Sequence, residues 1–318
     1  MKRGQEEPAV RLEGVSRKYG AVTALKDVSL DIRAGEMVGL LGRNGAGKTT
    51  LLNLITGYLP PTAGRIRVDG MDMLENPREC KRRIGYAPEQ PPLYDEMTVE
   101  GYLSFVCDLR EVARQGKAAH IQEILAICSL EEMGRRLIGH LSKGYRQRVG
   151  IAQVLCGSPD VLIFDEPTVG LDPVQVVEIR QLLRRLGGEH TVLFSSHILS
   201  EVQQICSSVL ILQAGKLVKS FDLHEQNGAA SCLELSVAAT EEEILPALRS
   251  LPFIRRMEKL PSKEEGTVRL QLTCGRAGEP GLITDRIFHL CAARDLPIRE
   301  MFPVRDDLES TFIRAIQQ

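Results

Sequence analysis

A glycine-rich segment between two apolar segments carries the strongest chemical signal. Gly42–Thr50 reads GRNGAGKTT and matches the pattern G-x-x-x-x-G-K-[ST]. The preceding run, Met37–Leu41, is typical of a buried strand, and Lys48–Thr56 is typical of a helix. Such a turn surrounds phosphates with backbone N–H groups, while the lysine reaches the terminal phosphates and the threonine hydroxyl binds Mg²⁺. The sequence therefore predicts a phosphate-binding loop, formed by Gly42, Arg43, Asn44, Gly45, Ala46, Gly47, Lys48, Thr49 and Thr50.

Two adjacent carboxylates follow a second apolar run. Val161–Phe164 predicts a buried strand, and Asp165 and Glu166 come directly after it. In a parallel sheet that end of a strand faces the ligand crevice. Paired carboxylates in a loop are often only solvated surface, but the strand before them and the phosphate loop upstream favour chemistry. Asp165 is expected to share Mg²⁺ with Thr49, and Glu166 to orient and deprotonate an attacking water.

Three other residues are candidates at the ends of predicted elements. Tyr19 lies in a turn, where its ring either packs on the surface or offers a stacking face to an adenine base. Ser142 is a good N-cap for a helix that runs to about Cys156. His197 ends another apolar strand, which begins at Thr191.

Composition places the chain among ordinary soluble globular proteins. It has 318 residues, of which 43% are hydrophobic and 26% charged, and a net charge of −2. That balance argues against a global basic field for nucleic acid. The N-terminus does not resemble a signal peptide, and no run approaches the roughly 18 apolar residues of a membrane helix. The 8 cysteines include no C-x-x-C pair, so reduced, buried thiols in a cytosolic protein are expected.

The order of elements predicts two domains. Residues 8–222 alternate strands with helices, which indicates a largely parallel α/β sheet, preceded by an antiparallel β-subdomain and interrupted by a helical block at about 94–158. Residues 227–230 are a plausible linker. Residues 231–318 read as β-α-β-β-α-β, the split βαβ order of a small ferredoxin-like α+β domain, with a closing helix at 307–316.

A short motif upstream of these carboxylates gives the family resemblance. Leu141–Tyr145 reads LSKGY, and the strand that follows it reads VLIFDEP. With the phosphate loop, these segments resemble the ATP-binding subunits of ABC transporters over about residues 8–220. The resemblance implies an ABC-type ATPase of the P-loop class that uses ATP and Mg²⁺.

The resemblance also implies roles for residues that spacing alone leaves open. Ser142 and Gly144 would face the γ-phosphate of ATP held by a second copy of the chain. Tyr19 corresponds to the adenine-stacking aromatic residue of the family. His197 corresponds to the histidine that contacts the γ-phosphate, and Gly170–Asp172 to the loop that links the two catalytic sites.

Two departures from the family pattern stand out. The glutamine that senses Mg²⁺ usually follows a proline directly, whereas here Pro88 is followed by Glu89 and then Gln90. That role stays open between Glu89 and Gln90. The second departure is Lys143 and Tyr145 within the LSKGY motif. This variant resembles the motif of subunits that drive exporters through a separate membrane chain, including gliding-associated and multidrug-like systems.

The leading interpretation is an ATPase that dimerises and powers export through a separately encoded transmembrane permease. The chain would then be cytoplasmic and peripheral on the inner face of the cell membrane, with the helical block and residues 88–92 as its contact surface. The alternative is a soluble ATP-driven switch on nucleic acid or ribosomes. One phosphate loop, one signature, no heptads and no basic stripe disfavour that class, and the absence of N-K-x-D disfavours a GTPase. The C-terminal domain would serve regulation, dimerisation or ligand sensing.

Overall fold

The computed structural model describes residues 7–223, 231–262, 266–274 and 280–304. Contacts divide the chain into two compact units, one ending at residue 223 and the other beginning at residue 224. The linker predicted at residues 227–230 and the closing helix predicted at residues 307–316 lie outside the described residues. The larger unit contains all the candidate site residues.

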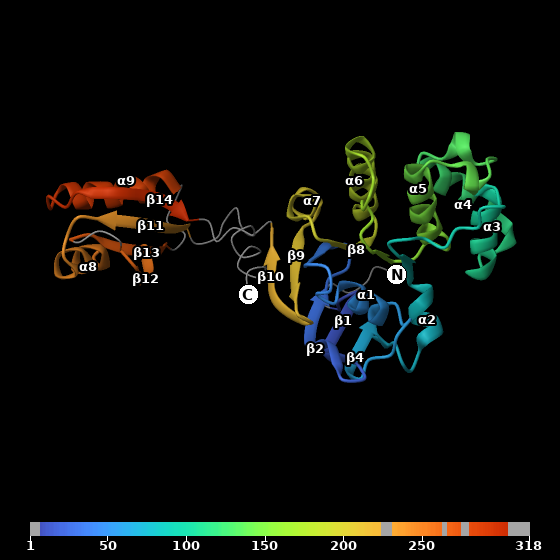
Figure 1. The fold of residues 1–318 in the computed structure, drawn as a ribbon, viewed down its shortest axis with the longest axis horizontal. Helices are drawn as coiled ribbons and strands as arrows, with labels where there is room; N and C mark the ends of the chain where they lie inside the picture. The colour runs from blue at the N-terminus through green and yellow to red at the C-terminus, as the bar shows by residue number, and fades with distance from the viewer. Residues whose placement is uncertain (1–6, 224–230, 263–265, 275–279, 305–318) are drawn as a thin grey trace. The chain divides into compact units, whose positions relative to one another are not determined.

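A six-stranded sheet in the order β10-β9-β3-β8-β7-β6 forms the centre of the larger unit (Figure 1). Its strands are β3 (Met37–Leu41), β6 (Ile84–Ala87), β7 (Val161–Phe164), β8 (Thr191–Ser196), β9 (Ser208–Gln213) and β10 (Lys216–Asp222). Neighbouring strands from β9 to β6 are parallel, whereas β10 is antiparallel to β9. Every residue of β3, β7 and β8 is buried, as in a sheet covered on both faces. The carboxyl ends of these three strands therefore meet at one edge.

Helices connect the strands of this sheet. They are α1 (Lys48–Ile55), α2 (Pro77–Arg82), α6 (Pro173–Gly187) and α7 (Leu199–Ile205). The carboxylate of Asp172 caps α6 by accepting hydrogen bonds from the backbone N–H groups of Val174 and Gln175, each at 3.0 Å. One face of α6 buries residues at helical spacing, which are Ile179, Leu182, Leu183 and Leu186.

The predicted antiparallel β-subdomain is present as a second sheet in the order β2-β1-β4-β5. It consists of β1 (Val10–Tyr19), β2 (Val22–Ile32), β4 (Ala63–Val68) and β5 (Met71–Asp72). Strand β1 is antiparallel to both β2 and β4, so Val10 lies opposite Ile32 on one side and Val68 on the other. β1 continues to Tyr19, which the sequence places in a turn, because the bulged register of β1 keeps pairing with β2.

The inserted helical block contains α3 (Val99–Leu109), α4 (Arg114–Ile127) and α5 (Lys143–Leu155), with short 3₁₀ turns at Glu131–Met133 and Ile138–His140. The Thr98 hydroxyl caps α3 by accepting a hydrogen bond from the Gly101 N–H at 3.1 Å. Helix α4 is interrupted in its first turn at Gln115 and Gly116, where the backbone is not helical. Gly116 has a φ of 91°, which explains why the helical pattern resumes only after it.

Replacing Leu103 with Ala is expected to destabilise the larger unit by about 2–5 kcal/mol, because a leucine lost from a closed core leaves a cavity. Leu103 on α3 is completely buried. The midpoint of urea unfolding measures the change. Leu74→Ala is the matched control, because Leu74 is 59% exposed and its loss should cost under about 0.5 kcal/mol. Equal losses in the two variants would contradict the placement of Leu103 in the core.

The smaller unit has the predicted β-α-β-β-α-β order. Its elements are β11 (Ser231–Val237), α8 (Glu241–Arg249), β12 (Ile254–Leu260), β13 (Val268–Cys274), α9 (Pro280–Ala292) and β14 (Ile298–Val304). The sheet order β12-β13-β11-β14 is antiparallel throughout. Thr240 and Glu243 form a capping box at the start of α8, which holds the pKa of the Glu243 carboxyl below its usual value. The unit also has its own core, centred on residues such as Leu235, Leu248 and Ile287.

The cysteines whose side chains the structure describes are buried and reduced, as the sequence predicts. They are Cys80, Cys107, Cys128, Cys156, Cys206, Cys274 and Cys291. Burial raises the pKa of the Cys128 thiol to about 12. A thiol with so high a pKa is a poor nucleophile, so Cys128 acts as a packing group.

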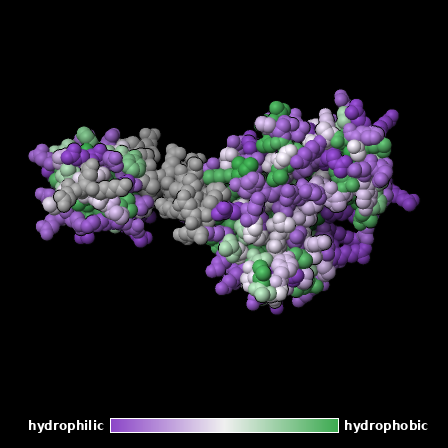
Figure 2. Space-filling model, in the orientation of Figure 1, coloured by the Kyte–Doolittle hydropathy of each residue, from purple (hydrophilic) through white to green (hydrophobic). Residues whose placement is uncertain are grey.

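The outer surface is mixed in character. Figure 2 shows hydrophobic residues scattered among more numerous hydrophilic ones on the visible face of the larger unit. Within the described part of the chain, no helix is both long and apolar enough to cross a bilayer.

Candidate functional site

The phosphate loop joins the buried strand β3 to the first turn of α1. Gly47 immediately precedes α1 with a φ of 106°, and a Cβ there would lie 2.9 Å from the carbonyl oxygen of Ala24. Glycine is therefore required for the turn to close against β2. The loop lines a cavity of about 540 Å³ together with residues of β2, and Glu89 and Glu166 also reach this cavity. The volume and lining suit a phosphate-bearing ligand of moderate size.

Lys48 lies at the centre of this site. Its ammonium donates to the carbonyl oxygens of Gly42, at 2.8 Å, and Arg43, at 3.4 Å. It also lies 3.0 Å from Oε1 of Glu166, and both side chains are less than a tenth exposed. Because the low dielectric of a buried site strengthens electrostatic interactions, this cation can attract phosphate oxygens strongly.

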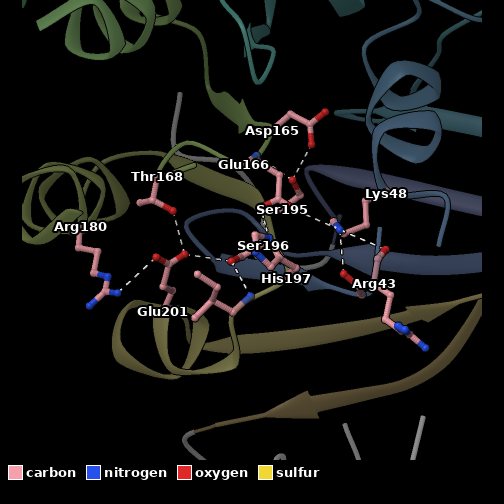
Figure 3. Close-up of polar contacts among 12 residues, drawn as sticks. Arg43, Lys48, Asp165, Glu166, Thr168, Arg180, Ser195, Ser196, His197 and Glu201 are labelled. Atoms are coloured by element: carbon pink, nitrogen blue, oxygen red, sulfur yellow. Dashed lines mark hydrogen bonds and ion pairs between the residues drawn. The ribbon is translucent and has the colours of Figure 1, made fainter. Parts of the chain in front are cut away.

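Asp165 and Glu166 follow β7 and are held by the neighbouring strand (Figure 3). The Ser195 hydroxyl on β8 donates to Oδ1 of Asp165 at 2.6 Å and accepts from the backbone N–H of Glu166 at 2.9 Å. Glu166 has a φ of 46°, an unusual value for a non-glycine residue. The hydrogen bond from Glu166 to Ser195 helps to hold this conformation, so the neighbouring strand fixes the direction of both carboxylates.

His197 follows the end of β8 and meets the same glutamate. Its Nδ1 lies 2.9 Å from Oε2 of Glu166. Glu166 thus contacts Lys48 through one carboxylate oxygen and His197 through the other. The structure therefore brings together three residues that lie far apart in the sequence, and all three were singled out from it.

The other candidates occupy more peripheral positions. Tyr19 ends β1 with a ring that is 44% exposed, and the Arg17 guanidinium lies 4.8 Å from the centre of that ring. Ser142 caps α5 by accepting from the Tyr145 N–H at 3.5 Å, and Gly144 is buried against the Gln175 side chain of α6. Neither Ser142 nor Gly144 lines the phosphate-loop cavity of its own chain.

The two alternatives for the metal-sensing position differ in placement. Both are exposed, but Glu89 lines the phosphate-loop cavity and Gln90 does not. Thr49 lines the same cavity, and Asp165 is buried beside Glu166.

Sequence reasoning missed two residues that organise the site. Ser195 and Glu201 have buried side chains that hydrogen-bond to the catalytic segments. The position of Ser195 at the end of an apolar strand is a weak indication of a role in the site. The sequence gives no such indication for Glu201, since a glutamate in a helix is usually solvated.

Comparison with known proteins places this site in a family. The ABC transporter family matches residues 25–169. The chain is 42% identical over 203 residues to the ABC transporter ATP-binding protein NatA of Bacillus subtilis. This match covers 63% of this chain and 82% of NatA. It is 34% identical over 324 residues to the bacitracin transport ATP-binding protein BcrA of Bacillus licheniformis, covering 96% of this chain and 97% of BcrA.

Solved structures agree. An ATP-binding subunit of an ABC transporter, 30% identical, superposes with a TM-score of 0.63 over 69% of this chain and 92% of its own. The dimeric structure of the bacterial ABC transporter cassette MJ0796 is 26% identical. It superposes with a TM-score of 0.62 over 67% of this chain and 98% of its own chain. The fold and family expected from the sequence are therefore confirmed. With its phosphate loop beside paired carboxylates and its relatives matched over most of their length, the chain belongs to the ATP-binding subunits of ABC transporters, the ATPases that drive transport.

Proposed function

We propose that two copies of this chain bind ATP and Mg²⁺ between them and use hydrolysis to power export through a separately encoded permease. The observation that carries the proposal is the contact of Lys48 and His197 with the two carboxylate oxygens of Glu166, at the edge of the phosphate-loop cavity. These groups combine a cation for phosphate, a base for water and an imidazole that holds the base.

The catalytic steps follow from the chemistry of these residues. The backbone of Gly42–Thr50 cradles the phosphates, and Lys48 neutralises charge on the terminal ones. A water oxygen attacks the γ-phosphorus, Glu166 accepts the water's proton, and the bond to ADP breaks. His197 contacts the γ-phosphate while it holds the Glu166 carboxylate. Tyr19 provides the stacking surface for adenine.

The residues near the γ-phosphate fit Mg²⁺. Thr49, Asp165 and Glu89 offer hydroxyl and carboxylate oxygens, the donors this ion prefers, and Thr49 and Glu89 share one cavity. When bound, the ion would neutralise phosphate charge as the terminal bond breaks. Of the two alternatives for the metal-sensing residue, the cavity supports Glu89, and Gln90 remains the candidate to test beside it.

The second copy completes the site. Ser142 and Gly144 lie at the N-terminus of α5, outside the cavity of their own chain, and would face the γ-phosphate held by the partner copy. The dimeric MJ0796 cassette supports this pairing, as does its structure bound to ADP and Pi, which is 27% identical.

The names of two relatives support transport out of the cell. BcrA is named for bacitracin transport, and LnrL of Bacillus subtilis, 31% identical over 249 residues, for linearmycin resistance. A permease partner would hold the chain at the inner face of the cell membrane. The division of the chain's contacts at residue 223 supports one ATPase domain over residues 8–222 and an accessory domain over residues 231–318. None of these observations favours the alternative switch on nucleic acid or ribosomes.

A groove on the larger unit is the proposed contact with the permease. It encloses about 600 Å³ between α1, α2 and the end of α3, and its lining includes Tyr58, Arg78 and Leu109. Tyr58 and Leu109 are 76% and 68% exposed, so their apolar surface is open to a partner. Leu109 belongs to the helical block whose surface the sequence predicts as the contact.

Purification of the tagged chain from detergent-solubilised membranes of its own cells tests the proposal. A protein with several long apolar segments should co-purify with the wild type, and Leu109→Asp should reduce its recovery at least about 10-fold, since a buried charge weakens a contact strongly. Val218→Asp is the control, because Val218 is exposed on β10 and does not line the groove. Recovery of ribosomes in place of a membrane protein would support the alternative.

A further inference from the structure

A buried carboxylate on α7 lies beside the catalytic residues and is not part of the motifs described above. Glu201 is 2% exposed. Its Oε2 accepts hydrogen bonds from the hydroxyls of Thr168, at 2.9 Å, and Ser196, at 3.0 Å. Figure 3 shows Glu201 between these two side chains, with Arg180 approaching from the opposite side. One carboxylate oxygen therefore joins two segments that are distant in the sequence.

Both segments carry a residue of the catalytic site. Thr168 lies two positions after Glu166, in a turn closed by a hydrogen bond of 3.2 Å from the Val169 N–H to the Glu166 carbonyl. Ser196 immediately precedes His197, and its hydroxyl accepts from the Ile198 N–H at 3.0 Å. Glu201 thus fastens the turn that contains Glu166 to the turn that contains His197.

Glu201 also has an ionic partner in the interior. Arg180 on α6 places Nη2 at 3.3 Å from Oε1 of Glu201. Arg180 is itself held by Gln204, whose side-chain oxygen accepts from Nη1 at 3.0 Å. A buried carboxylate with a cationic partner and two hydroxyl donors is satisfied, so the arrangement is rigid.

We propose that Glu201 is a positioning residue that sets the geometry between Glu166 and His197 for hydrolysis. The inference rests on the proposed function, which gives those two residues their roles. Glu201, Thr168 and Ser196 do not line the phosphate-loop cavity, so they have no direct part in holding nucleotide. Loss of Glu201 should therefore lower kcat and leave the affinity for nucleotide unchanged.

The first experiment measures kcat and the dissociation constant for ATP in purified Glu201→Ala. We expect kcat to fall about 10- to 100-fold, as small misplacements of catalytic groups do, with the ATP dissociation constant within about 2-fold of wild type. Glu201→Gln should recover most of the rate, because its amide oxygen still accepts from both hydroxyls. Gln204→Ala is the matched control: it removes a partner of Arg180 and leaves the contacts of Glu201 with Thr168 and Ser196 in place, so kcat should not change.

A second experiment tests the route of the effect and avoids a variant that fails to fold. The double variant Thr168→Val/Ser196→Ala removes only the two hydroxyls, and its kcat should fall as in Glu201→Ala. Adding Glu201→Ala to that background should change kcat less than about 3-fold, because contacts through the same groups are not additive.

The outcomes separate this inference from the proposed function. A normal kcat in Glu201→Ala, together with no turnover in Glu166→Gln, would overturn the positioning role alone. A full additional loss when Glu201→Ala is placed in the double variant would overturn it as well, as would a parallel loss of ATP affinity. Normal turnover in Glu166→Gln would overturn the catalytic assignment and, with it, the positioning role.

Discussion

Glu166→Gln is expected to stop ATP turnover and to preserve ATP binding. The amide has nearly the shape of the carboxylate but cannot accept a proton from water, so kcat should fall about 10²- to 10⁴-fold. Lys48 keeps its hydrogen bonds to the carbonyl oxygens of Gly42 and Arg43, so Lys48 and the loop backbone still hold the phosphates. Phosphate release measures the first effect, and equilibrium binding of ATP the second. With ATP bound and not consumed, size-exclusion chromatography should show a dimer.

Glu178→Gln is the matched control for this result. Glu178 also lies on the larger unit and forms an ion pair with Arg148, but its side chain is 46% exposed and far in the sequence from the phosphate loop. Its kcat should equal that of the wild type, because exposed pairs contribute little. A Glu166→Gln protein that hydrolyses ATP at the normal rate would exclude Glu166 as the general base.

Lys48→Ala is expected to weaken the binding of ATP. An interaction between a charged donor and a phosphate contributes about 1.5–3 kcal/mol, which corresponds to a loss of roughly 10- to 150-fold in ATP affinity. The removal also leaves Oε1 of Glu166 without its 3.0 Å cationic neighbour, so repulsion between this carboxylate and the phosphates adds to the loss. Titration with ATP under equilibrium conditions measures the dissociation constant.

Lys117→Ala controls for the loss of an ion-paired lysine. Lys117 on α4 pairs with Asp108, at 2.9 Å, within the helical block. Its ATP affinity should remain within about 2-fold of wild type, because screened charges at a distance contribute little. If the two lysine variants bound ATP equally well, the assignment of Lys48 to the terminal phosphates would be wrong.

The phosphate loop, the buried strands and the family were predictable because their signals are local. Gly42–Thr50 specifies its turn within nine residues, and Val161–Phe164 is apolar on both faces because helices cover both sides of the sheet. The split βαβ order of the smaller unit was also readable, since Thr240 and Glu243 mark a helix start directly.

Contacts between distant segments were not predictable. Ser195 and Asp165 are thirty positions apart and meet only because β7 and β8 are neighbours in the sheet. The alternation of strands with helices predicts a parallel sheet but not the order of its strands, so it cannot say which side chains face each other. Glu201 was missed for the same reason, because its burial depends on Arg180 from another helix.

The position of the metal-sensing residue illustrates an intermediate case. The sequence left Glu89 and Gln90 open, because motif spacing alone cannot say which of two consecutive side chains turns inward. The structure places Glu89 in the cavity lining. Both residues lie in a bend after β6, where no regular alternation of side chains applies, so only the folded loop decides which of them lines the cavity.

The paired serines at the end of β8 limit how the chain can change in length. Because successive side chains of a strand point to opposite faces, Ser195 reaches Asp165 while Ser196 reaches Glu201. A single residue inserted or deleted within β8 would exchange those directions and disconnect both networks at once. A single substitution in this strand leaves the directions of the other side chains unchanged, whereas an insertion or deletion is compatible with both networks only in the loops around the strand.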